Sequence, residues 1–259
     1  MLNRKLERIH ERIHEACRRA GRPTGSVTLI GATKGVPVEV IRQALSLGLT
    51  DIGENRVQEA RLKQGELKVH AEYGMRNAEL TSHTPHSALR TPHGVVRWHL
   101  IGHLQSNKAT RAVELFDAIH SVDSLALIQE LERRANKTDV FIQVNVAGEP
   151  TKFGCPPEEA ATLARAVRHG SHLQLKGFMT MAPFSENPED ARPHFRKLRE
   201  LRDAVNSKLE TRHSKLTLSM GMSADFEVAI EEGADLVRIG TALFGDRGRG
   251  AGGVGSEKL

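Results

Sequence analysis

Apolar residues recur at three- or four-residue intervals near the start of the chain. The residues on this spacing, with charged positions between them, are Leu2, Leu6, Ile9, Ile13 and Cys17. This pattern predicts an opening helix with one apolar stripe. Gly21 and Pro23 end the predicted helix.

From there the chain alternates between short β-rich runs and longer amphipathic segments. The runs are 27–34, 50–55, 95–102, 116–123, 139–146, 174–181, 215–220 and 235–240, and examples of the helical patterns are Val38–Leu47, Leu125–Arg134 and Ala191–Leu209. Strands that alternate with helices predict parallel pairing, because parallel neighbours need a long return connection. An open doubly wound sheet would also show nearly continuous apolar strands. The strand count favours a single (β/α)8 TIM-type barrel with an extra N-terminal helix.

Two regions depart from this alternation. Residues from about 64 to 96 are polar and rich in histidine, without a sustained period, which predicts an inserted loop outside the core. Its histidines are His70, His83, His86 and His93. No HxH or HxxxH pair fixes a metal geometry among them, so no metal site is expected. We expect the barrel domain to span residues 1–247, followed by a flexible Gly-rich tail over 248–259.

Composition narrows the classes of protein that remain. No stretch approaches the roughly 20 apolar residues of a membrane helix, and the charged N-terminus is unlike a signal peptide, which predicts a cytoplasmic location without membrane contact. Cys17 and Cys155 lack CxxC spacing, so reduced thiols are expected. Net charge is +5, but aromatic residues are only 4% and basic residues alternate with acidic ones, so nucleic-acid binding is not expected.

Polar residues follow the carboxyl ends of the predicted strands, where barrels of this kind build their active sites. They are Lys34, Glu54, Asn55, His99, Asn145, Ser219, Arg238, Gly240 and Thr241. Lys34 follows a run that otherwise resembles a buried strand. A desolvated lysine has a lowered pKa and attacks aldehydes, so Schiff-base chemistry is one interpretation. The alternative is a lysine just past the strand that extends into water.

The last two strands carry the features of a phosphate site. Gly240 permits close backbone approach, Thr241 adds a hydroxyl, and 241–244 predicts a short helix whose first amides face an anion. Gly221 lies in the Gly- and Ser-containing turn after the seventh strand, and turn formation alone would also explain these residues. Arg238 lies on the same side of its strand as Gly240. It would either donate to a pyridine nitrogen or form an ion pair with a carboxylate such as Glu54.

Long motifs carry a resemblance to a known family. They are GATKG, DIGENRVQEA, WHLIGHLQSNK, NVAGEPTKFG, GFMTMAP and LSMGMSADFEVAIEEGADLVRIGTALFG. With these motifs the chain resembles the pyridoxal-phosphate homeostasis protein family, the YggS/PROSC group, which is similar to the N-terminal barrel of alanine racemase. The resemblance covers nearly the whole chain apart from the insertion and the tail.

The resemblance implies a fold-type III barrel that binds pyridoxal 5'-phosphate (PLP) as an aldimine on Lys34. Arg238 would face the pyridine nitrogen. The residues implied at the phosphate are Ser219, Met220, Gly221, Gly240 and Thr241, and those implied around the ring and the lysine are Asn55, His99 and Met179. Members of the family buffer PLP and influence vitamin B6 and amino-acid pools, which implies PLP, related vitamers and PLP-dependent apo-enzymes as partners.

The sequence leaves two other functions open beside this carrier role. The first is a PLP-dependent amino-acid racemase. Related racemases use a second base, a tyrosine from an additional domain, whereas the only tyrosine here, Tyr73, lies in the insertion. We therefore expect no efficient turnover, with slow proton exchange by Lys34 left open. Because no second domain is expected that would form a racemase-like interface, we expect a monomer. The second is a partner-binding barrel that has lost its cofactor.

Overall fold

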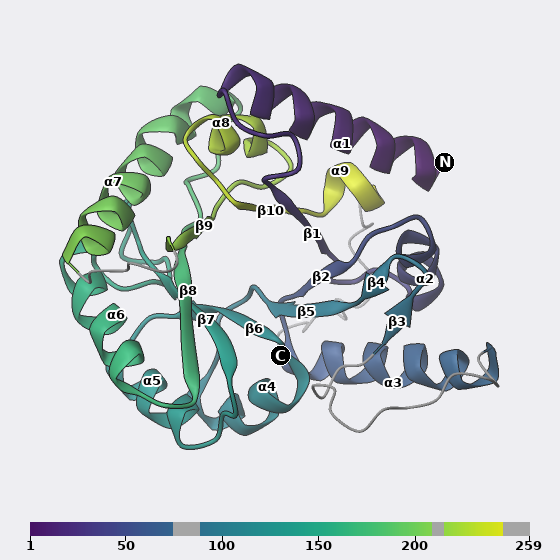
Figure 1. The fold of residues 1–259 in the computed structure, drawn as a ribbon, viewed down its shortest axis with the longest axis horizontal. Helices are drawn as coiled ribbons and strands as arrows, with labels where there is room; N and C mark the ends of the chain where they lie inside the picture. The colour runs from purple at the N-terminus through teal and green to yellow at the C-terminus, as the bar shows by residue number, and fades with distance from the viewer. Residues whose placement is uncertain (75–88, 209–214, 246–259) are drawn as a thin grey trace, which may run out of the picture.

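The computed structural model describes residues 1–74, 89–208 and 215–245. Its centre is a closed barrel of parallel strands in the order β1-β10-β9-β8-β7-β6-β5-β2 (Figure 1). The strands are β1 Thr28–Ala32, β2 Asp51–Glu54, β5 Arg97–Leu100, β6 Ala118–Val122, β7 Thr138–Gln143, β8 Leu173–Met179, β9 Thr217–Ser219 and β10 Leu236–Ile239. Each of the eight β-rich runs contributes one strand, so the predicted TIM-type barrel is confirmed.

Strand β1 closes the ring, because it pairs with β10 on one side and with β2 on the other. Ile30 is in register with both Arg238 of β10 and Asp51 of β2. The end of β1, which leads to Lys34, therefore lies between the end of β10 and the end of β2. This arrangement decides which loops surround the lysine.

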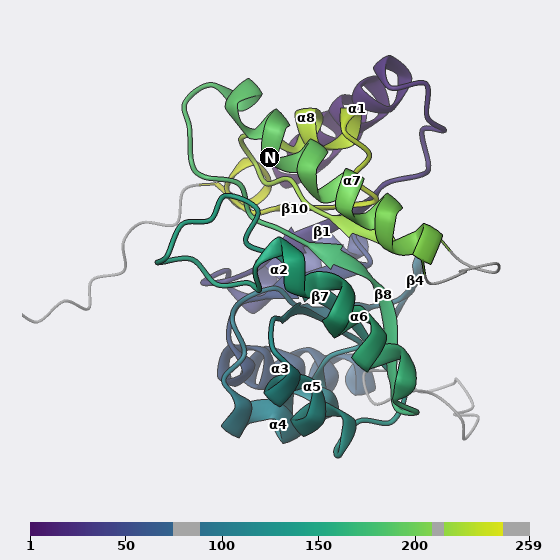
Figure 2. The ribbon, with the colours of Figure 1, turned by 90° about the vertical axis from the view of Figure 1, so that its left-hand side faces the viewer.

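Helices surround the barrel (Figures 1 and 2). They are α2 Val38–Ser46, α3 Val57–Gly74, α4 Ala109–Leu115, α5 Leu125–Glu132, α6 Ala160–His169, α7 Arg192–Lys208, α8 Phe226–Glu231 and α9 Thr241–Phe244, with short 3-10 helices at Ser106–Lys108, Pro157–Glu159 and Pro188–Ala191. Local signals set some boundaries: the Ser124 side chain accepts from the amide of Leu127 at the start of α5. The predicted helices over Val38–Leu47 and Leu125–Arg134 are confirmed to within a few residues.

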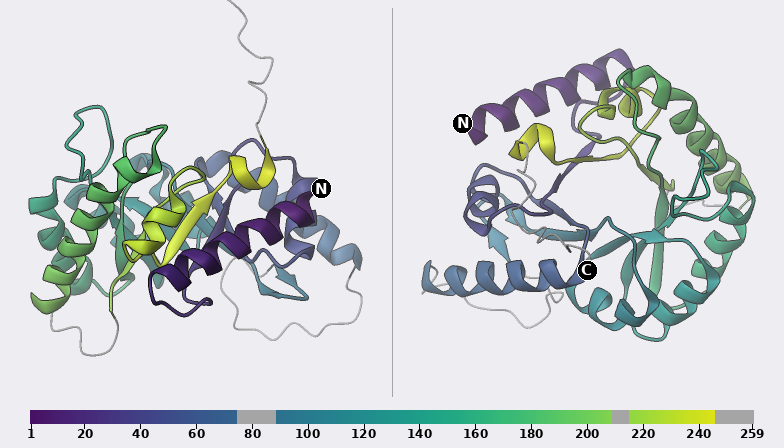
Figure 3. Two further views of the ribbon diagram at one scale, coloured as in Figure 1. Left: turned by 90° about the horizontal axis from the view of Figure 1, so that it is seen from above. Right: turned by 180° about the vertical axis from the view of Figure 1, so that it is seen from behind.

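Helix α1, Leu2–Arg19, is the extra N-terminal helix. Its buried stripe consists of Leu2, Leu6, Ile9, Ile13, Ala16 and Cys17. The stripe packs against α8 and α9 on the outside of the barrel (Figure 3). Arg22, just after α1, donates to the carbonyl oxygens of Ile230 and Ala234 at 3.1 and 2.6 Å, which attaches the end of this segment to the last βα unit.

The interpretation of residues 64–96 as a loop outside the core is wrong at both ends. Helix α3 continues to Gly74, and an antiparallel hairpin forms from β3 Arg90–Thr91 and β4 Gly94–Val95. Leu67 is buried, and the Gln64 side chain donates to the carbonyl of Leu115 at 2.7 Å. These inward-facing residues extend the helix because the barrel wall covers their face.

The remaining part of the insertion, with His83 and His86, lies outside the described residues, as do the side chains of His70 and Tyr73 and the tail from residue 246. In the described part of the chain, no group of His, Cys, Asp and Glu side chains has the arrangement of a metal site. None of the helices described is both long and apolar enough to cross a bilayer. Cys17 and Cys155 are buried free thiols.

Candidate functional site

Lys34 lies two residues beyond the end of β1, with an exposed side chain. The interpretation of Lys34 as a desolvated strand residue is therefore wrong, because the strand ends at Ala32 and the side chain extends into solvent at the barrel mouth. The backbone on both sides of it is fixed. Thr33 is fully buried and its amide donates to Gly53 at 2.9 Å, while Gly35 adopts a positive φ of 68° and its amide donates to Glu59 at 2.6 Å.

An ion cluster holds these flanking residues. Lys63 of α3 donates to Glu54 at 2.7 Å, to Glu59 at 2.7 Å and to the carbonyl of Thr33 at 2.6 Å. The Thr33 hydroxyl donates to the same Glu54 oxygen at 2.6 Å. Burial raises the pKa of Glu54, although the hydrogen bonds from Lys63 and Thr33 oppose that shift. Because Thr33 precedes Lys34 directly, the cluster fixes the direction in which the lysine leaves the barrel.

Arg238 of β10 lies in the barrel interior and is 4% exposed. It donates to the Ser219 carbonyl at 2.8 Å, to the Ser219 hydroxyl at 2.7 Å and to the Thr180 carbonyl at 2.8 Å. Among the described residues no carboxylate forms an ion pair with it, and Glu54 pairs with Lys63 instead. Burial lowers the pKa of Arg238 to about 10, partly offset by the charge of Asp225. The ion pair with Glu54 is thus wrong, and the hydrogen-bond acceptors of Arg238 among the described residues are all neutral.

A chain of hydrogen bonds crosses the interior from Arg238. The Ser219 hydroxyl contacts Nδ1 of His120 at 2.9 Å, Nε2 of His120 contacts Nδ1 of His99 at 2.9 Å, and Nε2 of His99 contacts Asp51 at 2.9 Å. Arginine can only donate and an ionised carboxylate can only accept, so Arg238 donates to the Ser219 oxygen and His99 donates to Asp51 through Nε2. The direction of the two bonds between them, from Ser219 to His120 and from His120 to His99, follows the tautomers of the two imidazoles.

Burial and neighbouring charges shift the pKa values of two groups in this chain, His120 and Asp51. Burial lowers the pKa of His120 well below its usual range, and the nearby His99 and Arg238 lower it further. Burial alone would raise the pKa of Asp51, but the hydrogen bond from His99 holds it below its ordinary value. His120 also stacks on Phe141, with ring centroids 4.2 Å apart. The chain is therefore a fixed support beneath the mouth, with a carboxylate at one end and a guanidinium at the other.

The loops after β9 and β10 meet at the mouth. The Ser223 hydroxyl oxygen accepts from the amides of Gly240 and Ala242, both at 3.3 Å, so two backbone donors already converge on one oxygen position. Thr241, between them, is exposed, and the predicted short helix begins there. Gly221 has a φ of 93°, and a Cβ on it would lie 2.6 Å from the Cβ of Ala229, so only glycine lets this loop pack on α8.

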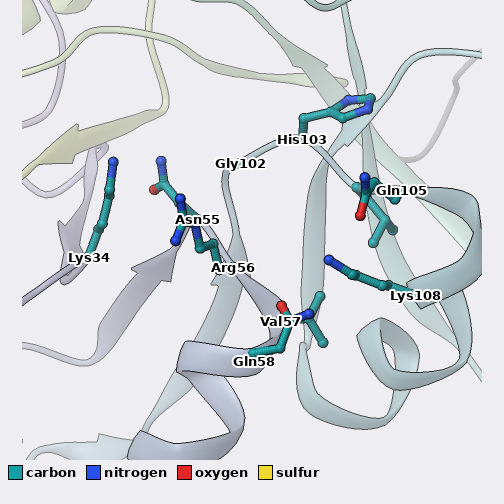
Figure 4. A pocket seen from close by; sticks show the side chains of 10 residues that line it. Lys34, Asn55, Arg56, Val57, Gln58, Gly102, His103, Gln105 and Lys108 are labelled. Atoms are coloured by element: carbon teal, nitrogen blue, oxygen red, sulfur yellow. The ribbon is translucent and has the colours of Figure 1, made fainter. Parts of the chain in front are cut away.

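On the other side of Lys34, a pocket of about 640 Å³ opens between the ends of β1, β2 and β5. Its polar lining includes Lys34, Asn55, Arg56, His103, Gln105 and Lys108 (Figure 4). Lys34 and Asn55 point in the same direction in Figure 4, and Lys108 points across the pocket toward them. The two loops that form its wall touch, because a Cβ on Gly102 would lie 2.4 Å from the carbonyl oxygen of Asn55.

The expected site residues thus separate into two layers. Lys34, Asn55, Gly240 and Thr241 lie at the mouth, and Gly221 shapes the loop beside them. Five side chains are fully or almost fully buried: His99, Met179, Ser219, Met220 and Arg238. Met179 packs with Ala118 and Phe141 inside the barrel. The Ser219 hydroxyl is 0% exposed and is bonded to Arg238 and His120, so its implied place at the phosphate stays a prediction.

Sequence reasoning missed the partners that hold these groups. They are Asp51, Lys63, His120, Thr180 and Ser223. For Asp51 and His120 a signal existed, since each is a polar residue within an apolar strand run, where an inward-facing polar group needs a buried partner. No comparable signal marked Thr180, which accepts through its backbone carbonyl.

Known proteins are similar to this chain in sequence and in fold. Residues 5–248 match the family model described as the N-terminal domain of alanine racemase. The pyridoxal phosphate homeostasis protein of Aquifex aeolicus is 44% identical over 250 residues, covering 95% of this chain and 96% of that protein. The chain belongs to this family. Its predicted membership is confirmed.

Solved structures place the family among related barrels. PipY of Synechococcus elongatus, solved with PLP bound, is 32% identical with a TM-score of 0.73, covering 95% of this chain and 100% of that one. Alanine racemase of Clostridium difficile has a TM-score of 0.64 at 15% identity, covering 95% of this chain and 57% of that one. The racemase likeness shows the shared barrel fold alone.

Proposed function

We propose that this protein binds PLP at Lys34 and serves in PLP homeostasis as a carrier of the cofactor. Relatives that cover almost the whole chain are named pyridoxal phosphate homeostasis proteins, and the related PipY binds PLP in its structure. The observation that carries the proposal is Arg238, a buried cation that pairs with no carboxylate of the described residues and lies beneath the mouth that holds an exposed lysine.

The residues present fit this cofactor. Bound PLP supplies an aldehyde that bonds to an amine and a pyridine ring that withdraws electrons. Lys34 is the amine, held in direction by the Lys63 cluster. The amides of Gly240 and Ala242, with Thr241, are suited to the phosphate because they already converge on the Ser223 oxygen.

The remaining expected residues act at the floor and the wall of the site. Arg238 would donate to the ring nitrogen, and Ser219 and His99 would act through it as members of the supporting chain. Met179 would contribute to the apolar layer below, Met220 and Gly221 would shape the loop near the phosphate, and Asn55 would border the ring.

Arg238 also affects the electronic properties of the bound ring. An arginine retains its proton, so a ring nitrogen that accepts from Arg238 stays unprotonated, which weakens the ring as an electron sink. We further propose that the protein acts as a monomer in the cytoplasm. It would exchange PLP and related vitamers with PLP-dependent apo-enzymes.

The test is the visible spectrum of purified protein loaded with PLP. We expect an absorption band that borohydride removes, and a reduced adduct that peptide mass mapping places on Lys34. Lys34→Ala should lose the band, whereas Lys176→Ala, which removes a lysine of β8 that pairs with Asp139 at 3.2 Å, should keep it. An adduct on another side chain would refute the assignment, and multiple-turnover formation of D-amino acids would refute the carrier role.

A further inference from the structure

The pocket of about 640 Å³ beside Lys34 lies on the opposite side of this lysine from Thr241. Lys34 follows β1, which has β10 on one side and β2 on the other. A cofactor that extended from Thr241, after β10, to Lys34 would therefore leave the pocket at the ends of β2 and β5 free. The volume is in the range of small-molecule sites, roughly 300–1,000 Å³.

The charge of this pocket is one-sided. Lys34, Arg56 and Lys108 line it, and no Asp or Glu side chain of the described residues does. Across residues 1–74, 89–208 and 215–245, neither Arg56 nor Lys108 forms an ion pair. By contrast, Arg111 on α4, three residues after Lys108, pairs with Glu114 at 2.8 Å. The nearby Glu59 is already bonded to Lys63 and to the amide of Gly35.

Three cations that face one cavity repel one another, and that repulsion is relieved when an anion enters. Neutral hydrogen-bond donors are available beside them, since the Asn55 and Gln105 side chains also line the space. Lys108 is half-buried and Arg56 is exposed, so the charges meet at a mouth that a solute can reach. Figure 4 shows their side chains on opposite walls.

We propose that this pocket is an anion subsite, separate from the position of the cofactor phosphate, which binds a small dianion through Arg56 and Lys108. The ligand class is a phosphate monoester or a dicarboxylate of similar size. The subsite does not depend on the cofactor and thus goes beyond the proposed function.

Isothermal titration calorimetry with two probes, inorganic phosphate and succinate, tests the subsite on PLP-loaded protein, in which the cofactor occupies its own phosphate position. Arg56→Gln and Lys108→Gln should each weaken binding about ten- to one-hundred-fold, as expected for one charge-assisted contact. The matched controls are Arg61→Gln on α3 and Arg111→Gln on α4, which remove an exposed cation outside the pocket from the helices that directly follow Arg56 and Lys108. They should change the dissociation constant less than twofold.

The two probes separate the sources of the dianion, because the probe that binds more tightly identifies the ligand class. Absence of binding by both probes, or equal weakening in all four variants, would overturn the subsite. Loss of phosphate binding upon PLP loading, without succinate binding, would also overturn it, because the phosphate would then occupy the cofactor position. If PLP does not attach to Lys34, the proposed function fails, and the same titrations on unloaded Thr241→Val protein still decide the subsite.

Discussion

Replacement of Lys63 by methionine removes the cation that holds the loop of Lys34. The Lys63 ammonium donates to Glu54, Glu59 and the Thr33 carbonyl at 2.6–2.7 Å, and the two side chains of its main pair are 8% and 0% exposed. The second carboxylate oxygen of Glu54 already makes no hydrogen bond within the described residues. Lys63→Met therefore leaves a buried and uncompensated carboxylate, for which we expect a loss of about 3–5 kcal/mol in the free energy of unfolding.

This loss is measured by urea unfolding, with far-ultraviolet circular dichroism as the signal. The double variant Glu54→Gln/Lys63→Met should recover about 1–2 kcal/mol, because its buried amide carries no charge. Lys68→Met, an exposed position on the same helix, should stay within about 0.5 kcal/mol of the wild type.

The pH dependence of Lys63→Met follows from the same carboxylate. Because the pKa of Glu54 is raised by burial, its protonated form is favoured in the folded state. The stability that this proton contributes is present at low pH and is lost as pH rises through the folded-state pKa. The deficit of Lys63→Met should thus be smaller at pH 5 than at pH 8. A deficit below about 1 kcal/mol that is the same at both pH values would refute the buried-charge reasoning.

Three further substitutions test the other parts of the site. Thr241→Val should weaken PLP binding by roughly 1.5–3 kcal/mol, measured by fluorescence titration, because it removes one hydrogen bond to a charged oxygen; an unchanged dissociation constant would exclude this contact. His120→Phe should reduce the free energy of unfolding by about 1–3 kcal/mol, because Ser219 and His99 lose their partner, and it should shift the absorption of bound PLP. An unchanged spectrum would show that the chain does not act on Arg238. Gly221→Ala should lower the free energy of unfolding by more than Gly148→Ala. Both glycines have a positive φ, 93° and 71°, but the added Cβ would lie 2.6 Å from Ala229 only at Gly221, whereas Gly148 has open space around it. Equal losses in urea unfolding would show that the contact relaxes.

The barrel could be predicted because its signals are local. Apolar runs such as 139–146 and 235–240 have the length of buried strands, and their alternation with helices of one-sided polarity admits few topologies. Arg238 was placed correctly on β10, whereas Gly240 directly follows the strand and caps α9. The helical extension after Lys63 was missed, because its inward face is sparse in apolar residues and is instead held by Lys63 and Gln64.

The sequence by itself determined the strands, their order and the lysine and glycines at their carboxyl ends, because each depends on spacing along a few residues. Only the tertiary structure decided that Glu54 binds Lys63 and that Arg238 is supported by a chain from Ser219 to Asp51. Hydrogen bonds and ion pairs act over about 3 Å. Closure of the barrel brings Asp51, His120 and Ser219, which are far apart along the chain, within that distance of their partners, and spacing along the chain cannot determine such pairings.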